Sequence, residues 1–216
     1  MEDLHSYLNP KDYWDRTAKD KTFTHPLNLN EIESYINQQS TIVDYGCGYG
    51  RLVKELTENG YSNVRGFDIS AELIIRGIKN GVQNIATINS PLELSIENES
   101  VDCFMLFAIL TCIPKNKDQE DLIQLLHSKL KSGGIIYISD YYIQQHSIEL
   151  DRYETLNEDK FNHGVFKLND GITFRHHTKE WITQLFKAFY LIKEWEIQVK
   201  TMNGNDARAF QMIVKK

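Results

Sequence analysis

The chain has 216 residues, of which 41% are hydrophobic and 25% charged, a balance typical of an ordinary globular domain with one sizeable core. No apolar run approaches the roughly 20 residues that cross a bilayer, and the acidic first residues lack the features of a signal peptide, so we expect a cytoplasmic protein without membrane association. The net charge of −6 and the lack of a Lys/Arg cluster disfavour nucleic acid as a partner.

Residues 1–40 are expected to form a helical segment ahead of the main pattern. Pro10 suits the first turn of a helix. Pro26 ends this helical stretch, because the residue before a proline, here His25, is pushed out of helical geometry. A second helix is expected over Leu29–Gln38. We expect the segment 1–40 to act as a lid over a site in the domain that follows.

Between residues 41 and 140, short apolar runs alternate with stretches of helical spacing. The predicted strands are Thr41–Tyr45, Asn63–Asp68, Asn84–Ile88, Val101–Ala108 and Ile135–Ser139. The predicted helices are Gly50–Glu58, one capped by Ser70 that runs to Lys79, and Asp118–Leu130, the last ended by the glycines of Lys131–Gly134. Strands buried on both faces give unbroken apolar runs, and strand–helix alternation implies parallel pairing. The pattern therefore predicts a three-layer α/β sandwich.

The C-terminal part departs from this alternation. A helix over Lys179–Phe189 is followed by two strands, Tyr190–Lys200 and Ala207–Lys215. The dipeptide Asn203-Gly204 between them favours a hairpin turn, so we expect the last strand to be antiparallel to its neighbour. The stretch 141–177 has no long periodic pattern but is rich in aromatic residues and histidines. A long segment of this kind inside a domain predicts a substrate-side insertion.

Three glycines lie between the first strand and the helix that follows it, in the sequence Val43-Asp44-Tyr45-Gly46-Cys47-Gly48-Tyr49-Gly50. A glycine-rich turn at this place lets backbone N–H groups approach a ligand that a Cβ would exclude. About twenty residues further on, Asp68 ends the next strand. A carboxylate there can accept both hydroxyls of a ribose. The combination therefore predicts a cofactor that contains a nucleoside.

The spacing of the loop indicates which nucleoside cofactor is bound. The pattern is G-x-G-x-G, whereas a dinucleotide fold has G-x-G-x-x-G. Asp44 beside the loop would repel a pyrophosphate but suits the ammonium group of a methionine moiety. No Lys-Ser/Thr pair follows the glycines, which excludes a phosphate-binding P-loop. S-adenosylmethionine (SAM) fits best, and a NAD-dependent reductase is disfavoured.

With the segment VDYGCGYGRL and Asp68, residues 41–140 resemble the class I SAM-dependent methyltransferases, and the C-terminal hairpin extends the likeness. The segment LKSGG at Leu130–Gly134 is similar to a turn that this family carries before its fifth strand. The resemblance implies a Rossmann-like α/β sandwich with a seven-stranded, mostly parallel sheet. It also implies that residues 1–216 form a single methyltransferase domain.

The resemblance also implies contacts to the cofactor. The loop backbone would face the methionine part, Ile69 would pack on adenine, and Phe107 would lie near the sulfonium. The family often has aspartate where this chain has Ser90, so Asn89, Ser90 and the backbone all stay open as the polar contact to adenine. The cofactor-binding candidates are Asp44, Gly46, Cys47, Gly48, Gly50, Asp68, Ile69, Ser90, Leu92 and Phe107.

Methyl transfer from a sulfonium needs mainly alignment of the acceptor, which can supply on the order of 7–11 kcal/mol. A general base adds typically about 10²–10⁴-fold where the acceptor must lose a proton. Ligands in open α/β sheets lie beyond the carboxyl ends of the strands. On this ground the candidate bases are His25, Asp140, His176 and His177, and the candidate acceptor-binding residues are Trp14, Phe23, Cys112 and Tyr141.

Several readings of the function stay open. The first is methylation of a small molecule at O, N or S. The others are a protein or tRNA methyltransferase, disfavoured by the acidic charge, and a SAM-binding regulatory protein without turnover. No metal site is predicted, because the three cysteines fit no zinc spacing and the adjacent pair His176-His177 has no further placed ligand. The sequence does not reveal the oligomeric state.

Overall fold

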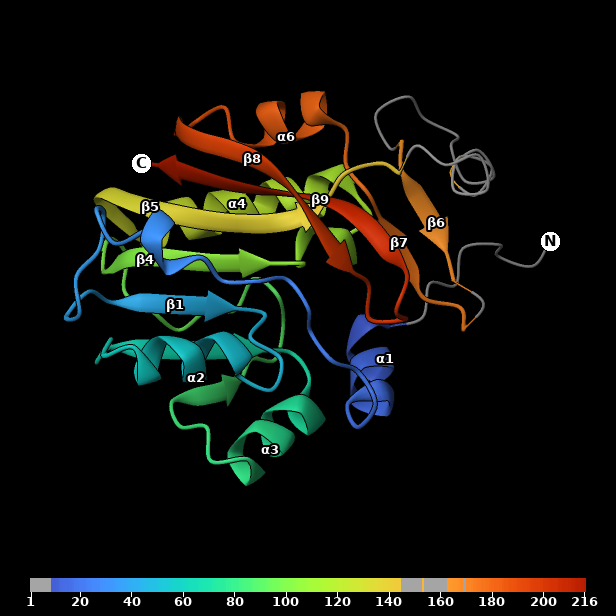
Figure 1. Ribbon diagram of the computed structural model, residues 1–216, viewed down its shortest axis with the longest axis horizontal. Coiled ribbons are helices and arrows are strands. Elements are labelled where there is room, and N and C mark those ends of the chain that lie inside the picture. Colours follow the sequence, from blue (N-terminus) through green and yellow to red (C-terminus); the bar gives the residue numbers. More distant parts are fainter. Residues whose placement is uncertain (1–8, 145–152, 154–162, 169) are drawn as a thin grey trace.

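The computed structural model describes residues 9–144, 153, 163–168 and 170–216 (Figure 1). Its main sheet has seven strands in the order β3-β2-β1-β4-β5-β9-β8. These strands are β1 (Ile42–Tyr45), β2 (Val64–Asp68), β3 (Ile85–Thr87), β4 (Val101–Phe107), β5 (Leu130–Tyr141), β8 (Tyr190–Lys200) and β9 (Asp206–Lys215). The first five pair in parallel, whereas β9 is antiparallel to both β5 and β8. The predicted fold, with its antiparallel C-terminal hairpin strand, is confirmed.

Successive residues of a strand point to opposite sides of the sheet, so both faces carry apolar side chains that pack against helices. On one face Phe104 and Ile136 belong to a buried cluster that includes residues of α4 (Asn116–Lys129) and α6 (Lys179–Leu185). On the other face Met105 and Tyr137 pack in a cluster with residues of α2 (Arg51–Glu58) and α3 (Ala71–Lys79). This arrangement is the predicted three-layer sandwich.

Three predicted helix boundaries are wrong. In place of a helix over Leu29–Gln38 there is a short 3-10 helix, Leu29–Glu31, whose preceding residue Asn28 provides no side-chain cap. The helix α4 does not end on glycine: it stops at Lys129, because Leu130 adopts an extended conformation and pairs with Val101 as the start of β5. The helix α6 stops at Leu185. In the first two cases, local pattern reasoning missed the effect of contacts with the sheet.

The segments outside the sandwich gather at one end of the sheet. In Figure 1 the arrowheads of β1, β4 and β5 point toward the side on which α1 (Pro10–Thr17) and the pair β6 (Val165–Lys167) and β7 (Thr173–Arg175) lie. A shared aromatic cluster joins these elements; its large buried members are Tyr13, Trp14, Tyr153, Phe166 and Phe174. The predicted insertion 141–177 begins within β5, and its residues 145–152 and 154–162 lie outside the described part of the chain.

No helix among the described residues has the length and apolar character needed to cross a membrane.

Candidate cofactor and acceptor site

The glycine loop connects β1 to α2 and has a backbone that favours glycine. Gly46 and Gly48 have φ of +74° and +56°, in the left-handed region. A Cβ on Gly46 would lie 2.0 Å from Cδ1 of Ile109, and one on Gly48 would lie 2.0 Å from Cε2 of Phe23. The loop is therefore closed on both sides by apolar side chains, and neither position has room for a larger residue.

Asp68 ends β2 and connects the glycine loop to the next helix. Its Oδ2 accepts the N–H of Gly48 at 2.8 Å, and its Oδ1 accepts the N–H of Ser70 at 2.8 Å. Burial raises the pKa of this carboxyl, while the backbone donors oppose the shift. Each carboxylate oxygen has a second lone pair, so Asp68 can also accept the two hydroxyls of a ribose.

Asp44 and Arg51 place opposite charges at the start of α2. Burial raises the pKa of Asp44 to about 7, and the positive charge of Arg51 opposes this shift. The Nη2 of Arg51 donates to the carbonyl of His25, and its buried Nε has no partner among the described residues. Sequence reasoning assigned no role to Arg51, whose Nη1 also lies 3.4 Å from Oε2 of Glu55, one turn along α2.

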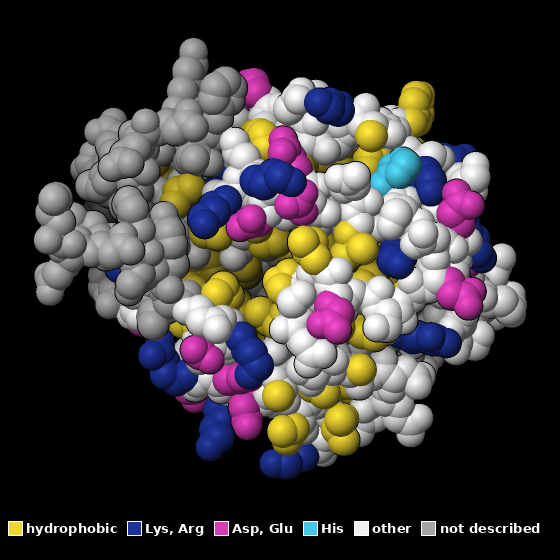
Figure 2. Space-filling model, turned by 180° about the vertical axis from the view of Figure 1, so that it is seen from behind, with side chains coloured by type: hydrophobic (Ala, Val, Ile, Leu, Met, Phe, Trp, Pro, Cys, Tyr) yellow, Lys and Arg dark blue, Asp and Glu magenta, His cyan; other side chains and the backbone are white. Residues whose placement is uncertain are grey.

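A cavity of about 460 Å³ lies between the glycine loop and the N-terminal segment. Among the sequence candidates, its lining includes Asp44, Gly46, Cys47, Asp68, Ile69, Ser90, Leu92 and Phe107 on the cofactor side, and Trp14, Phe23, His25, Cys112 and Tyr141 on the acceptor side. Seen from behind, hydrophobic side chains gather in a hollow near the centre of the molecule (Figure 2). The fold thus brings thirteen of the eighteen candidates to one space.

The remaining five candidates do not line this cavity: Gly48, Gly50, Asp140, His176 and His177. The two glycines give the loop its close packing, since a Cβ on Gly48 would meet Phe23 and one on Gly50 would lie 2.7 Å from Cγ1 of Val82. Residues that sequence reasoning did not select but that line the cavity include Arg51, Thr24, Ile109 and Met202. Most of these come from segments with no motif of their own.

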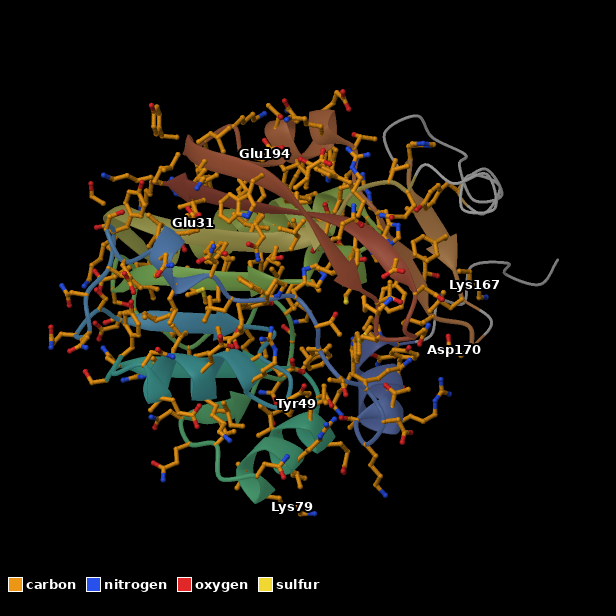
Figure 3. All side chains as sticks on the ribbon, in the orientation of Figure 1. Glu31, Tyr49, Lys79, Lys167, Asp170 and Glu194 are labelled. Atoms are coloured by element: carbon orange, nitrogen blue, oxygen red, sulfur yellow. The ribbon has the colours of Figure 1, made fainter. Side chains whose placement is uncertain are left out.

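The N-terminal segment covers the glycine loop through an aromatic stack. The ring of Phe23 lies parallel to that of Tyr49, with centroids 5.0 Å apart and 7° between the planes. The N–H of Phe23 donates to the hydroxyl of Tyr49 at 3.2 Å, and the guanidinium of Arg76 lies 4.2 Å from the Tyr49 ring centroid. In Figure 3 Tyr49 lies between α3 and α1. The segment around Phe23 is therefore fixed against the glycine loop.

The four candidate bases are in different surroundings. His25 is buried, with its Nδ1 2.7 Å from Oγ of Ser139, and burial together with the nearby Arg51 charge lowers its pKa to about 4. Asp140 accepts the N–H groups of Tyr141 at 2.7 Å and Thr111 at 3.2 Å. Of the four candidates, only His25 lines the cavity.

The two adjacent histidines point to separate partners. Nδ1 of His176 lies 2.5 Å from the hydroxyl of Tyr153. Nε2 of His177 lies 3.6 Å from Oδ1 of Asp140, and burial holds the pKa of His177 well below its usual range. Across the part of the chain that the structure describes, no group of three or more His, Cys, Asp or Glu is arranged to hold a metal ion.

Comparisons with known proteins define the family. A family model described as a methyltransferase domain matches residues 20–195. A SAM-dependent methyltransferase from Methanosarcina mazei superposes with a TM-score of 0.80 at 24% identity, covering 89% of this chain and 99% of the other. The chain therefore belongs to the methyltransferase-domain family, and its fold is that of the class I SAM-dependent methyltransferases.

Curated relatives of two kinds are similar to the chain. A probable inactive O-methyltransferase 11 from Dictyostelium discoideum is 24% identical over 168 residues, covering 72% of this chain and 48% of the relative. A ribosomal protein L11 methyltransferase from Hydrogenovibrio crunogenus is 32% identical over 108 residues, covering 49% and 36%. The chain spans about half or less of the length of these two relatives. One is named as an inactive O-methyltransferase and the other as a ribosomal protein methyltransferase, so the likeness extends to the family and not to an acceptor.

Proposed function

We propose that this protein transfers the methyl group of SAM to a small-molecule acceptor. The observation that carries the proposal is the cavity of about 460 Å³, which joins the acidic and glycine residues of the loop to aromatic side chains of the N-terminal segment. Its volume is in the range of small-molecule sites, roughly 300–1,000 Å³. A continuous space of this kind can hold a cofactor and a modest acceptor side by side.

The residues present fit SAM. Asp68 would accept the ribose hydroxyls, Ile69 and the segment Ser90–Leu92 would border adenine, and Phe107 would lie near the sulfonium. Asp44 and Arg51 offer opposite charges to the ammonium and carboxylate of the methionine part, and the unpartnered Nε of Arg51 supports this assignment. When bound, SAM supplies a methyl group already activated on sulfur. The chain's own residues then have to bind and orient the acceptor and exclude water.

The acceptor side is enclosed by parts of the chain that are distant in sequence. Trp14 and Phe23 come from the segment 1–40, Cys112 follows β4, and Tyr141 ends β5. Three of these four side chains are aromatic, which favours a planar or largely apolar molecule. We propose that residues 1–216 form a single domain, and that the segment around Trp14 and Phe23, together with Tyr141 at the start of the insertion 141–177, closes the acceptor side. Such closure favours a small molecule over a folded protein or a tRNA.

Turnover of SAM carrying a labelled methyl group tests the proposal. The purified chain would be incubated with phenols, amines and thiols, and in parallel with ribosomal proteins and tRNA. We expect label transfer to a member of the small-molecule set. Transfer only to protein or tRNA would contradict the acceptor class, and tight SAM binding without any transfer would favour a regulatory protein.

A substitution of Asp68 tests the assignment of the cofactor. Asp68→Ala removes the ribose acceptor, and we expect affinity for S-adenosylhomocysteine (SAH) to fall roughly tenfold to a hundredfold, the magnitude for hydrogen bonds to a charged group. Isothermal titration calorimetry measures this, and Asp68→Asn, which keeps one acceptor oxygen, should lose less. Asp206→Ala, on an exposed carboxylate of β9, is the control. Unchanged affinity in Asp68→Ala would show that the cofactor lies elsewhere.

A further inference from the structure

His25 is connected to the centre of the sheet by a buried chain of hydrogen bonds. The hydroxyl of Tyr137 donates to Oε1 of Gln211 at 2.9 Å. Nε2 of Gln211 donates to the carbonyl of Pro26 at 2.7 Å and to Oγ of Ser139 at 3.3 Å. Oγ of Ser139 lies 2.7 Å from Nδ1 of His25. Ser139 and Gln211 are opposite each other in the β5–β9 ladder, so the sheet register holds this chain in place.

The direction of each of these hydrogen bonds follows from the groups that can only accept or only donate. A backbone carbonyl only accepts, so the amide NH₂ of Gln211 faces Pro26 and its oxygen faces Tyr137. The second N–H of that amide then donates to Ser139, whose oxygen is the acceptor. The hydroxyl of Ser139 has one proton, and Nδ1 of His25 is the acceptor within reach. Nδ1 of His25 therefore carries no proton.

The opposite arrangement is less stable. If Nδ1–H donated to Ser139, two buried groups would lack a side-chain partner among the described residues: the proton of the Ser139 hydroxyl, which would accept twice, and the bare Nε2 of His25. In the first arrangement only the N–H at Nε2 lacks a partner among them. A buried unsatisfied donor costs about 1–3 kcal/mol. Since burial keeps the imidazole of His25 neutral near pH 7, with a pKa of about 4, one ring nitrogen holds the proton. That nitrogen is Nε2.

We propose that His25 presents an Nε2–H donor to the acceptor molecule, which therefore offers a lone pair to this N–H, as the oxygen of a phenol or enol does. Nε2 is buried without a partner among the described residues, and His25 is one of the residues that line the cavity. A bound oxygen would relieve the cost of this unpaired donor. The inference rests on the proposed function, because the cavity must hold the acceptor. A nitrogen that already carries a proton cannot remove one, so His25 binds and orients the acceptor.

The tautomer can be measured without any substrate. In wild-type protein with ¹⁵N-labelled histidine, long-range ¹H–¹⁵N correlation spectra assign the protonated ring nitrogen, and His25→Gln identifies the His25 signals. We expect Nε2 to be protonated and Nδ1 to be bare near pH 7. In Ser139→Ala the preference should weaken, since Nδ1 loses its donor. A wild-type ring protonated at Nδ1 would overturn the inference, whatever the cofactor affinity is.

Variants of His25 separate a donor from a base. The amide of glutamine places an N–H near the position of Nε2 but takes up no proton, whereas asparagine places its amide near Nδ1. With the oxygen acceptor that labels best in the turnover experiment, we expect His25→Gln to keep kcat/KM within about tenfold of wild type, and His25→Ala and His25→Asn to lose more. Equal loss in all three variants would overturn the donor role. SAH affinity, measured for each variant by calorimetry, reports separately on the proposed function.

Discussion

The buried carboxylates of this protein lie near the carboxyl ends of neighbouring parallel strands but differ in what they contact. Asp68 accepts two backbone N–H groups and lines the cavity, and Asp44 lies beside the cation Arg51. Asp140 accepts two backbone N–H groups and does not line the cavity. In the sequence each of the three lies at or near the end of an apolar run, and their neighbours in the chain do not show whether they face the cavity. Their different surroundings predict different effects of substitution.

The loop glycine Gly48 has an internal control in this chain. In Gly48→Ala the new Cβ would meet the ring of Phe23 at 2.0 Å, at a φ of +56°. Gly81 has a φ of +82°, and a Cβ added there would have nothing within 4 Å, so Gly81→Ala brings the backbone strain alone, roughly 1–2 kcal/mol. We expect Gly48→Ala to lower SAH affinity by at least about tenfold and Gly81→Ala to leave it unchanged. Isothermal titration calorimetry measures the SAH affinity of both variants. Equal affinities would show that the close approach of Gly48 to Phe23 has no role in cofactor binding.

Asp140 predicts a pH dependence of stability. Burial raises its pKa to about 7, above the ordinary value of 3.8. Between these two pKa values the folded state holds a proton on Asp140 that the unfolded state has released. The free energy of unfolding therefore falls as pH rises through this range, by up to about 1.4 kcal/mol per pH unit from this group. In Asp140→Asn the contribution is gone, and urea unfolding from pH 4.5 to 7 should show a less negative slope of free energy with pH than wild type. Parallel curves would contradict the raised pKa.

At the scale of elements, the N-terminal segment contributes to the site through Phe23. Its ring stacks on Tyr49 and covers Gly48, so Phe23→Ala opens the cavity beside the loop. Phe23 also lines the cavity, and losing roughly 20–60 Å² of apolar contact with the ligand at about 25 cal/mol per Å² would lower SAH affinity roughly two- to tenfold. Phe189→Ala is the control, since Phe189 is also partly buried against aromatic rings but lies after α6. A similar loss in both variants would indicate general destabilisation.

Prediction from sequence worked best for elements that local chemistry determines. Ser70 caps α3, its hydroxyl accepting the N–H of Leu73, and the hairpin turn at Gly204 has the φ of +84° that the Asn-Gly dipeptide favours. It failed where contacts with the sheet decide, as at Leu130, which pairs with Val101 and starts a strand directly after α4. A one-dimensional pattern does not contain such contacts. The predicted strand Ile135–Ser139 was too short for the same reason, since β5 spans Leu130–Tyr141. The bounds of the other strands of the main sheet agree with the prediction within one residue, because their apolar runs end at polar or glycine residues.

At the scale of the whole molecule, cofactor binding should stabilise the fold. A ligand at a hundredfold excess over its Kd adds about 2.7 kcal/mol, which for a chain of this size raises Tm by about 5–11 °C. We expect SAH to produce such a shift in differential scanning calorimetry. NAD should produce none, because the loop spacing and Asp44 disfavour a pyrophosphate. A shift with NAD and none with SAH would contradict the cofactor assignment.

The sequence by itself determined the class of this protein. Three local patterns indicate this class: the spacing of Gly46, Gly48 and Gly50, the carboxylate of Asp68, and the C-terminal hairpin. Each depends on the backbone geometry at one place in the chain. Only the tertiary structure decided which candidates meet. His25 and Ser139 are 114 residues apart in sequence and form one hydrogen bond, while Asp140, His176 and His177 lie away from the cavity. Contacts over such separations depend on how the whole sheet and the N-terminal segment pack, which no local pattern encodes.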